Sequence, residues 1–331
     1  MRFLLPSVLG FALTLAAATV PARAAPTASD ILTGFNAFVN GNFHTLHDVE
    51  GPVVVGGNLS GSGIFQNFGV PLGVSLQGFG SVNVFGSAGT SSHNANGLTV
   101  KIGTANVGSN FSGAASTTYN ATFPATKAEM WNQITALSSG FAALAPTTPA
   151  NTLPVANSNN AVLTAVPATV NGVANVGVID ITAALLGSYT GIAVNPNGAS
   201  TVIINVSGNY NAQPNWMNGQ NWRSKVIWNF ENATSVSLGA TGIQGTVLAP
   251  LATVTINNPI DGGLFAQNFV GDGELHFKPF TGNTQVINTI VPPGGPALNV
   301  PEPASMALLA TGVAGLALLR RRRAGRVAAG D

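Results

Sequence analysis

Short runs of β-branched and aromatic residues, each followed by glycine or asparagine, restrict the fold of this 331-residue chain more than any other feature. Val, Ile, Thr and aromatic side chains favour strands, whereas Gly and Asn supply turns. The runs expected to be strands are 53–55, 82–85, 98–102, 201–206, 225–230, 236–238 and 253–256. The sequence therefore predicts a mostly β chain built from many short strands.

The spacing of these runs indicates how the strands are arranged. Several runs end in the same way, with an apolar pair followed by Gly or Asn. Such a pattern is typical of the coils of a β-solenoid, in which each coil buries its inward residues on its neighbours. We therefore expect a single β-solenoid (β-helix) domain. The period is irregular, and a β-sandwich, which also has many short strands between turns, is the alternative.

One segment, at about residues 124–145, has the periodicity of a helix. Its apolar residues recur at intervals of three and four and form one helical face. They are Met130, Ile134, Leu137, Phe141 and Leu144. Thr126 and Glu129 have the spacing of a capping box, and Pro146 prevents continuation of the helix. We expect a long amphipathic helix packed alongside the strands.

Charged residues make up 7% of the chain, and there is no cysteine. Residues 25–299 contain five basic residues and nine acidic ones, so this part is acidic although the whole chain has a formal charge of +1. A nucleic-acid surface needs clustered Lys and Arg, which this composition does not provide. We expect no nucleic-acid partner, no thiol nucleophile, no disulfide and no cofactor.

The N-terminus has the three parts of a secretory signal peptide. Arg2 is the positive residue, residues 3–20 form an apolar stretch, and Ala22-Arg23-Ala24 is a small-x-small cleavage sequence. Residues 1–24 are therefore predicted to be removed during export, which leaves an ectodomain at residues 25–299.

The C-terminus, residues 300–325, carries a second targeting pattern. Pro301, Glu302 and Pro303 precede an uncharged, mostly apolar run at 304–319, and Arg320, Arg321, Arg322 and Arg323 follow it. The apolar run is predicted to be a transmembrane helix, with the arginines on the cytoplasmic side. The tripartite pattern resembles the PEP-CTERM sorting signal. This resemblance implies an exosortase-type protease as partner, with the protein anchored in the inner membrane before processing and at the cell surface or extracellular after it.

Two sequence blocks in the ectodomain resemble the choice-of-anchor A domain. The first is residues 48–59, and the second runs from 226 to 280 and includes the segment Gly245-Thr246-Val247-Leu248-Ala249-Pro250. The resemblance spans about residues 28–282. It implies a bacterial adhesive surface domain with a β-helical body, and it carries over no catalytic residues. Residues 246–255 are also distantly similar to the end of bacterial ice-binding β-solenoids.

Two groups of polar residues are candidates for a metal or acid–base site. Asp272, Glu274 and His276 alternate, so on a strand they would share one face and could bind calcium or zinc or act as a general acid and base. The alternative is a solvated face whose charge protects an open sheet edge. The second group lies at the start of the first block. It consists of His44, His47, Asp48 and Glu50.

An aromatic cluster lies in a segment rich in Asn and Gln. Tyr210, Trp216 and Trp222 are predicted to form a carbohydrate platform, because sugar C–H faces stack on aromatic rings and sugar hydroxyls bond amides. The alternative is that these residues hold a long loop in place, while Trp228 lies in the core of its strand.

Together these features predict an exported, non-enzymatic protein of the cell surface or extracellular matrix, an adhesin or a structural protein associated with exopolysaccharide in a biofilm. Its expected ligands are exopolysaccharide or other surface glycans. A secreted polysaccharide-active enzyme on the same scaffold is one alternative. An ice-binding-like protein is another, although Thr253 and Thr255 give only a single rank of threonines.

Overall fold

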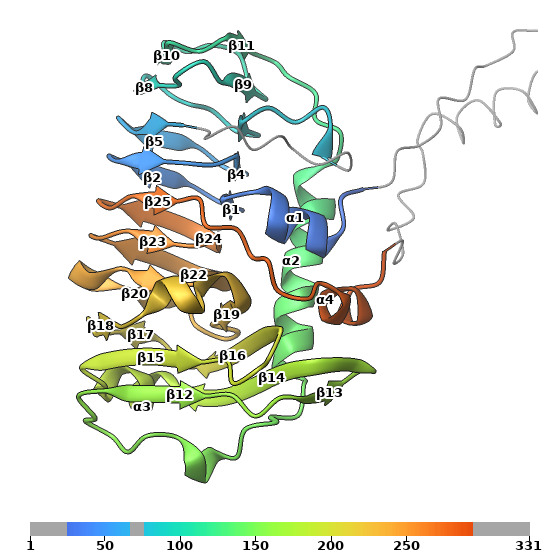
Figure 1. Ribbon diagram of the computed structural model, residues 1–331. Helices are drawn as coiled ribbons and strands as arrows, with labels where there is room; N and C mark the ends of the chain where they lie inside the picture. Colours follow the sequence, from blue (N-terminus) through green and yellow to red (C-terminus); the bar gives the residue numbers. More distant parts are fainter. Residues whose placement is uncertain (1–24, 67–75, 294–331) are drawn as a thin grey trace, which may run out of the picture.

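The computed structural model describes residues 25–66 and 76–293, as an elongated stack of short strands with a long helix beside it (Figure 1). The predicted signal peptide (1–24), the transmembrane segment (304–319) and the sorting signal lie outside the described residues. The prediction of a mostly β chain with a long helix alongside is confirmed, and three shorter α-helices accompany it.

The first half of the chain contains one short helix and eleven strands. These are α1 (Ala28–Gly34), β1 (Ala37–Val39), β2 (Phe43–Thr45), β3 (Asp48–Val49), β4 (Val53–Val55), β5 (Leu59–Gly61), β6 (Ile64–Phe65), β7 (Val82–Val84), β8 (Ser92–Asn94), β9 (Thr99–Ile102), β10 (Asn110–Ser112) and β11 (Ser116–Thr118). The long helix α2 (Lys127–Ala142) follows and connects the two halves.

The second half contains fourteen strands and the remaining helices. The strands are β12 (Ala161–Thr164), β13 (Ala168–Val170), β14 (Val173–Thr182), β15 (Gly191–Asn195), β16 (Thr201–Ser207), β17 (Tyr210–Asn211), β18 (Asn215–Trp216), β19 (Val226–Asn229), β20 (Ser235–Ser237), β21 (Ile243–Gln244), β22 (Thr246–Ile256), β23 (Ile260–Asp261), β24 (Leu264–Gly271) and β25 (Leu275–His276). The helices are α3 (Ala183–Ser188), α4 (Gln285–Ile290) and the 3₁₀ turns η2 (Ala150–Thr152), η3 (Gly219–Asn221), η4 (Arg223–Lys225) and η5 (Gly239–Thr241).

The strands of the first half and those of the second half meet in the middle of the stack. The main sheet has the order β11-β9-β7-β4-β1-β24-β22-β19-β16-β14-β13. The chain therefore starts in the middle, runs to one end at β11, passes along α2 to the other end, and returns until β24 pairs with β1. We call this junction the seam, defined by the pairings β1–β24, β2–β24 and β3–β25.

Almost all of the strand pairs are parallel, and β13–β14 is antiparallel. A second sheet has the order β10-β8-β6-β3-β25-β23-β21, and a three-stranded sheet, β12-β15-β18, lies at one end. In the first half, the chain alternates between the two larger sheets and returns to the main sheet next to the strands that it left, as in the order β1, β4, β7 and β9. This parallel pairing does not fit the β-sandwich alternative, because sandwich sheets are antiparallel.

Asparagine stabilises the corners between the strands. Asn268 Oδ1 accepts a hydrogen bond from the backbone N–H of Asn42 (2.9 Å), and Asn42 Oδ1 accepts one from Asn58 (3.0 Å). Asn58 Oδ1 accepts the next bond, from Ser87 (3.0 Å). All non-glycine residues with positive φ among the described residues are also asparagines. The high asparagine content therefore reflects side chains that bond the turn backbone and tolerate left-handed conformations.

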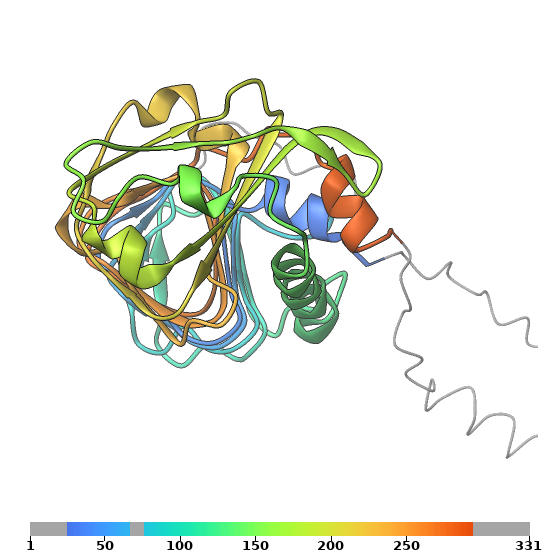
Figure 2. The ribbon, with the colours of Figure 1, turned by 90° about the horizontal axis from the view of Figure 1, so that it is seen from below.

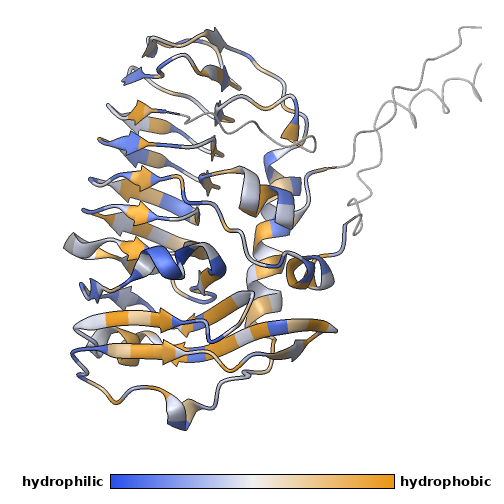
Figure 3. Ribbon diagram, in the orientation of Figure 1, coloured by the Kyte–Doolittle hydropathy of each residue, from blue (hydrophilic) through white to orange (hydrophobic). Residues whose placement is uncertain are grey.

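Hydrophobic residues lie along the strands, and hydrophilic residues gather at the turns (Figure 3). One cluster of buried residues fills the interior of the stack, and a second lies between the main sheet and helices α1, α2 and α4. Seen along the stack, these three helices lie on one side of it (Figure 2). The remaining sides of the stack do not contact these three helices.

Helix α2 begins and packs as its sequence predicts. Thr126 Oγ1 accepts a bond from Glu129 N (3.2 Å), and Glu129 Oε2 accepts one from Thr126 N (2.8 Å), which completes the capping box. The buried face includes Met130, Ile134 and Phe141. Each such side chain contributes about 1.5–3 kcal/mol by its burial.

A buried polar contact fixes α2 on the sheet. Asn229 Nδ2 donates to the backbone oxygen of Ser138 (3.0 Å) and to Asn205 Oδ1 (2.9 Å), and Ser138 Oγ donates to Asn229 Oδ1 (2.6 Å). Asn205 Nδ2 in turn donates to the backbone oxygen of Phe141 (2.9 Å). These directional bonds act together with the apolar contacts in fixing where the helix lies along the strands.

Candidate functional site

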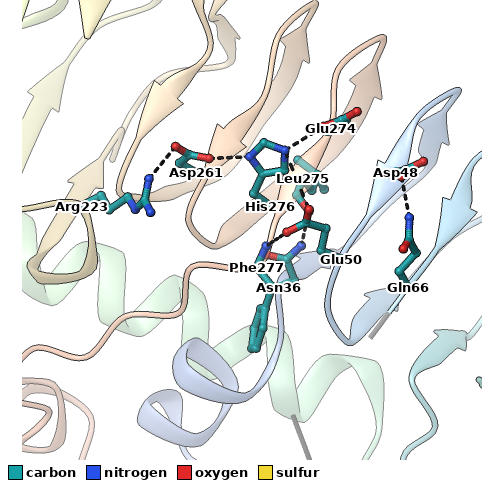
Figure 4. Close-up of polar contacts among 10 residues, drawn as sticks. All are labelled: Asn36, Asp48, Glu50, Gln66, Arg223, Asp261, Glu274, Leu275, His276 and Phe277. Atoms are coloured by element: carbon teal, nitrogen blue, oxygen red, sulfur yellow. Dashed lines mark hydrogen bonds and ion pairs between the residues drawn. The ribbon is translucent and has the colours of Figure 1, made fainter. Parts of the chain in front are cut away.

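The seam brings together residues from the two candidate groups of the sequence. Val49 of β3 pairs with Leu275 of β25, so Asp48 and Glu50 lie beside Glu274 and His276 (Figure 4). The backbone N–H of Glu50 donates to the oxygen of Leu275 (2.9 Å). Residues more than 220 positions apart therefore form one cluster, a proximity that neither group predicts by itself.

His276 is the centre of this cluster. Its Nδ1 lies 2.6 Å from Asp261 Oδ1, and its Nε2 lies 2.7 Å from Glu274 Oε2 and 3.9 Å from Glu50 Oε1. Both ring nitrogens face carboxylates, which accept but do not donate hydrogen bonds when ionised. The geometry is therefore that of a protonated imidazolium. Burial opposes this charge, but the hydrogen bonds to Asp261 and Glu274 outweigh it and raise the pKa of His276.

Asp261 connects His276 to an arginine. Arg223 Nη1 donates to Asp261 Oδ2 (2.8 Å), so the carboxylate lies between two cationic groups. Burial alone would raise the pKa of Asp261. The hydrogen bonds from His276 and Gln244 and the charge of Arg223 outweigh that effect and lower it. Asp261 is consequently ionised at neutral pH.

Asp48 and Glu50 complete the carboxylate group. Burial, followed by the nearby charge of Glu274, raises the pKa of Asp48, whose Oδ2 accepts a bond from Gln66 Nε2 (2.6 Å). Glu50 Oε2 accepts a bond from the backbone N–H of Phe277 (3.0 Å). Glu50 thus supports the backbone that follows β25, as well as facing His276.

The structure does not place the other candidates in this cluster. Asp272 precedes β25 and bonds His47 at a solvent-exposed corner, with 3.0 Å between Asp272 Oδ1 and His47 Nε2. His44 Nδ1 lies 3.0 Å from Ser60 Oγ on a different sheet. Of the three residues predicted to share a strand face, Glu274 and His276 are in contact, whereas Asp272 lies apart from them, and β25 contains only Leu275 and His276.

The contacts of the cluster are those of an ion network. A histidine ligand must offer one nitrogen lone pair to the metal, but both nitrogens of His276 already face carboxylates. In the part of the chain that the structure describes, no three or more His, Cys, Asp or Glu side chains form a group that could hold a metal ion. The arrangement can hold a proton on His276 and connect two stretches of chain by charge.

The structure places the predicted aromatic platform mainly in the core. Tyr210 is 1% exposed and Trp222 is 2% exposed, and Trp216 is half-buried. The ring centroids of Trp216 and Trp222 lie 5.3 and 6.4 Å from that of Trp228. Each tryptophan Nε1 donates to a backbone oxygen inside the fold. Stacking of a sugar on Tyr210 or Trp222 does not fit this placement, because their faces contact other side chains.

A regular surface, which the sequence analysis did not predict, lies on part of the main sheet. This part is formed by the strands β17, β20, β22, β24, β2 and β5. We call it the outer column, a row of residues in register on six adjacent strands. It consists of Asn211, Ser237, Thr255, Val270, His44 and Ser60. Their chain neighbours, such as Val236, Val254 and Phe269, point into the core, so the column faces outward. The column contains one histidine and no carboxylate, lysine or arginine.

The sequence holds a signal for both of the features that were missed. Asp261 lies on the strand that pairs with β25, and aligning strands 260–261 with 275–276 would have brought Asp261 and His276 together. Aligning Ser237 with Thr255 and Val270 in the same way would have predicted the outer column. Both alignments require the strand register, which the irregular spacing of the strands conceals.

Comparison with known protein families decides which family this fold represents. A model described as an ice-binding-like adhesive domain matches residues 28–277, which is most of the chain. The chain belongs to this family. The match covers the first block that resembles the choice-of-anchor A domain and all but the last three residues of the second, and the family description is compatible with that domain. No curated protein and no solved structure matches the chain.

A second family model, the PEP-CTERM protein-sorting motif, matches residues 299–323. This range contains the Pro-Glu-Pro triplet and the four arginines, so the predicted sorting signal is confirmed. The motif implies export and sorting to the cell surface, with an exosortase as the processing partner. Within residues 25–66 and 76–293, no helix has the length and apolar character needed to cross a membrane.

Proposed function

We propose that this adhesive-family protein is a non-enzymatic surface adhesin that binds exopolysaccharide through its outer column. The strand body is, on this proposal, a β-solenoid. Support comes from the parallel pairing of successive layers and from the asparagines that repeat at the corner from Asn268 through Asn42 to Asn58. The observation that carries the function is the outer column itself.

The chemistry of the outer column suits an uncharged polymer. Hydroxyl and amide side chains both donate and accept hydrogen bonds, as sugar hydroxyls do. Adjacent strands place these groups about 4.8 Å apart in a straight row. The aliphatic side chain of Val270, 45% exposed, gives an apolar contact for sugar C–H groups in the middle of the row. A polymer with a short repeat can therefore make several weak contacts at once, and avidity adds them together.

The position of the chain ends supports the same surface. Helices α1 and α4, which begin and end the described body, are joined by a bond from Ser29 Oγ to Asn288 Oδ1 (2.9 Å). Both ends of the described body therefore lie on this helix side (Figure 2). A C-terminal membrane segment would hold the helix side toward the membrane, which leaves the sides without these helices free for ligands.

Retention of the purified chain on the producing cell's exopolysaccharide tests the proposal, with the size of the polymer followed by chromatography. The proposal predicts retention with no shortening of the polymer. If the unmodified chain shortens the polymer, and folded Glu274→Gln and His276→Gln variants do not, the protein is a polysaccharide-active enzyme and not an adhesin. If the chain is not retained but produces thermal hysteresis in ice growth, the ice-binding alternative is correct and the adhesin proposal is wrong.

A further inference from the structure

The His276 cluster lies at the weakest part of the seam. In the main sheet, three residues of β1 and three of β2 pair with β24. In the second sheet, the seam consists of the single pair Leu275–Val49. The stack is thus joined here by few backbone bonds, and side-chain contacts contribute a larger share of its cohesion.

The charges at this point act across the seam. Asp261 of β23 and Glu274, next to β25, belong to the second half of the chain, whereas Glu50, next to β3, belongs to the first half. His276 contacts all three. Without its charge, Glu50 would face Glu274 with no cation between them.

We propose that His276 is a pH-sensitive link between the first and last coils, which holds the seam closed when the imidazole is protonated and loosens it when the proton is lost. The groups that face the ring are Asp261, Glu274 and Glu50, and Arg223 of η4 and Asp48 of β3 lie beyond them. Loss of the proton leaves four carboxylates near Arg223, which pairs with Asp261, and near His47, whose charge acts on Asp48. Repulsion then acts between Glu50 and Glu274 across the seam.

The direction of the pH dependence follows from the protonation equilibrium. The folded pKa of His276 is raised above its ordinary value of 6.5. Its contribution to stability is therefore complete below about pH 6.5 and is lost as the pH rises through the raised pKa. The seam is expected to be tightest in mildly acidic surroundings and weaker in alkaline ones.

Thermal unfolding of the full chain between pH 6 and pH 9 tests this link. We expect the Tm of the unmodified protein to fall by several degrees over this range. The Tm of His276→Gln should be low and nearly constant, because glutamine does not titrate. The matched control is His47→Gln, which removes the exposed pair with Asp272 and a charge near Asp48 but no contact of His276, and should keep the fall. A constant Tm in the unmodified protein, or an unchanged fall in His276→Gln, would overturn the link.

A second measurement needs no variant, and so it decides the question if His276→Gln does not fold. The ¹³Cε1 resonance of His276 should titrate with a midpoint above 6.5. Amide hydrogen exchange at Glu50 and Phe277, corrected for the intrinsic effect of pH, should rise several-fold through the same midpoint. A midpoint at or below 6.5, or exchange that does not follow the titration, contradicts the proposal.

Discussion

The buried contact between α2 and the main sheet gives the sharpest stability prediction, through Asn229→Ala. Asn229 is fully buried and makes three hydrogen bonds with Ser138 and Asn205. Alanine removes all three and leaves Ser138 Oγ and Asn205 Oδ1 without these partners in a buried place. Each buried polar group left unpaired costs about 1–3 kcal/mol, so we expect a loss of about 2–6 kcal/mol in the free energy of unfolding.

Urea unfolding followed by circular dichroism measures this loss by linear extrapolation. The exposed Asn221→Ala is the matched control and should change the free energy of unfolding by less than about 0.5 kcal/mol. Ser138→Ala, which removes one of the three bonds, should cost less than Asn229→Ala, and the double variant should cost less than the sum of the two. If Asn229→Ala costs no more than the control, the polar contact does not hold the helix.

Three further predictions concern the core, the pH response and the helix cap. His93 is packed between Phe65 and Phe111, and its burial lowers its pKa to about 4. The contribution of neutral His93 to stability is complete above pH 6.5, and the free energy of unfolding should fall by about 3 kcal/mol as the pH falls to about 4. His93→Phe should remove this pH dependence when the free energy of unfolding in urea is measured across the same range. Trp222→Ala should lower the free energy of unfolding in urea by about 3–5 kcal/mol, because the ring is buried. A variant of unchanged stability that no longer binds polysaccharide would contradict this prediction. Thr126→Ala should lower the same free energy by about 0.5–2 kcal/mol through loss of the α2 cap, and an unchanged value would mean that the cap is replaced.

Local features of this fold were predictable because their causes are local. The helix could be located from the spacing of Met130, Ile134 and Phe141, and its start from Thr126 and Glu129, since each depends on residues within a few turns. The strand segments followed from β-branched runs between Gly and Asn. The helix at residues 127–142 is shorter at both ends than the predicted helix at about 124–145. The first and last residues of the predicted segment lie outside its regular hydrogen bonding.

The long-range arrangement was not predictable from these patterns. Nothing local to Glu50 or to His276 indicates that the first strands pair with the last, because the pairing depends on α2 returning the chain to the far end of the stack. The aromatic platform was predicted wrongly for a related reason. Polar neighbours made Trp222 look exposed, whereas its indole N–H finds a backbone partner inside the fold, the oxygen of Met217 at 3.1 Å.

The central claim is that the outer column binds polysaccharide, and an affinity measurement on two arginine variants tests it most directly. Thr255→Arg places a large charged side chain in the middle of the column, whereas Asn132→Arg places the same side chain on the exposed face of α2. Binding isotherms with the producing cell's exopolysaccharide should show a large loss of affinity for the first variant and none for the second. Equal affinity of both variants and the unmodified chain would contradict the account.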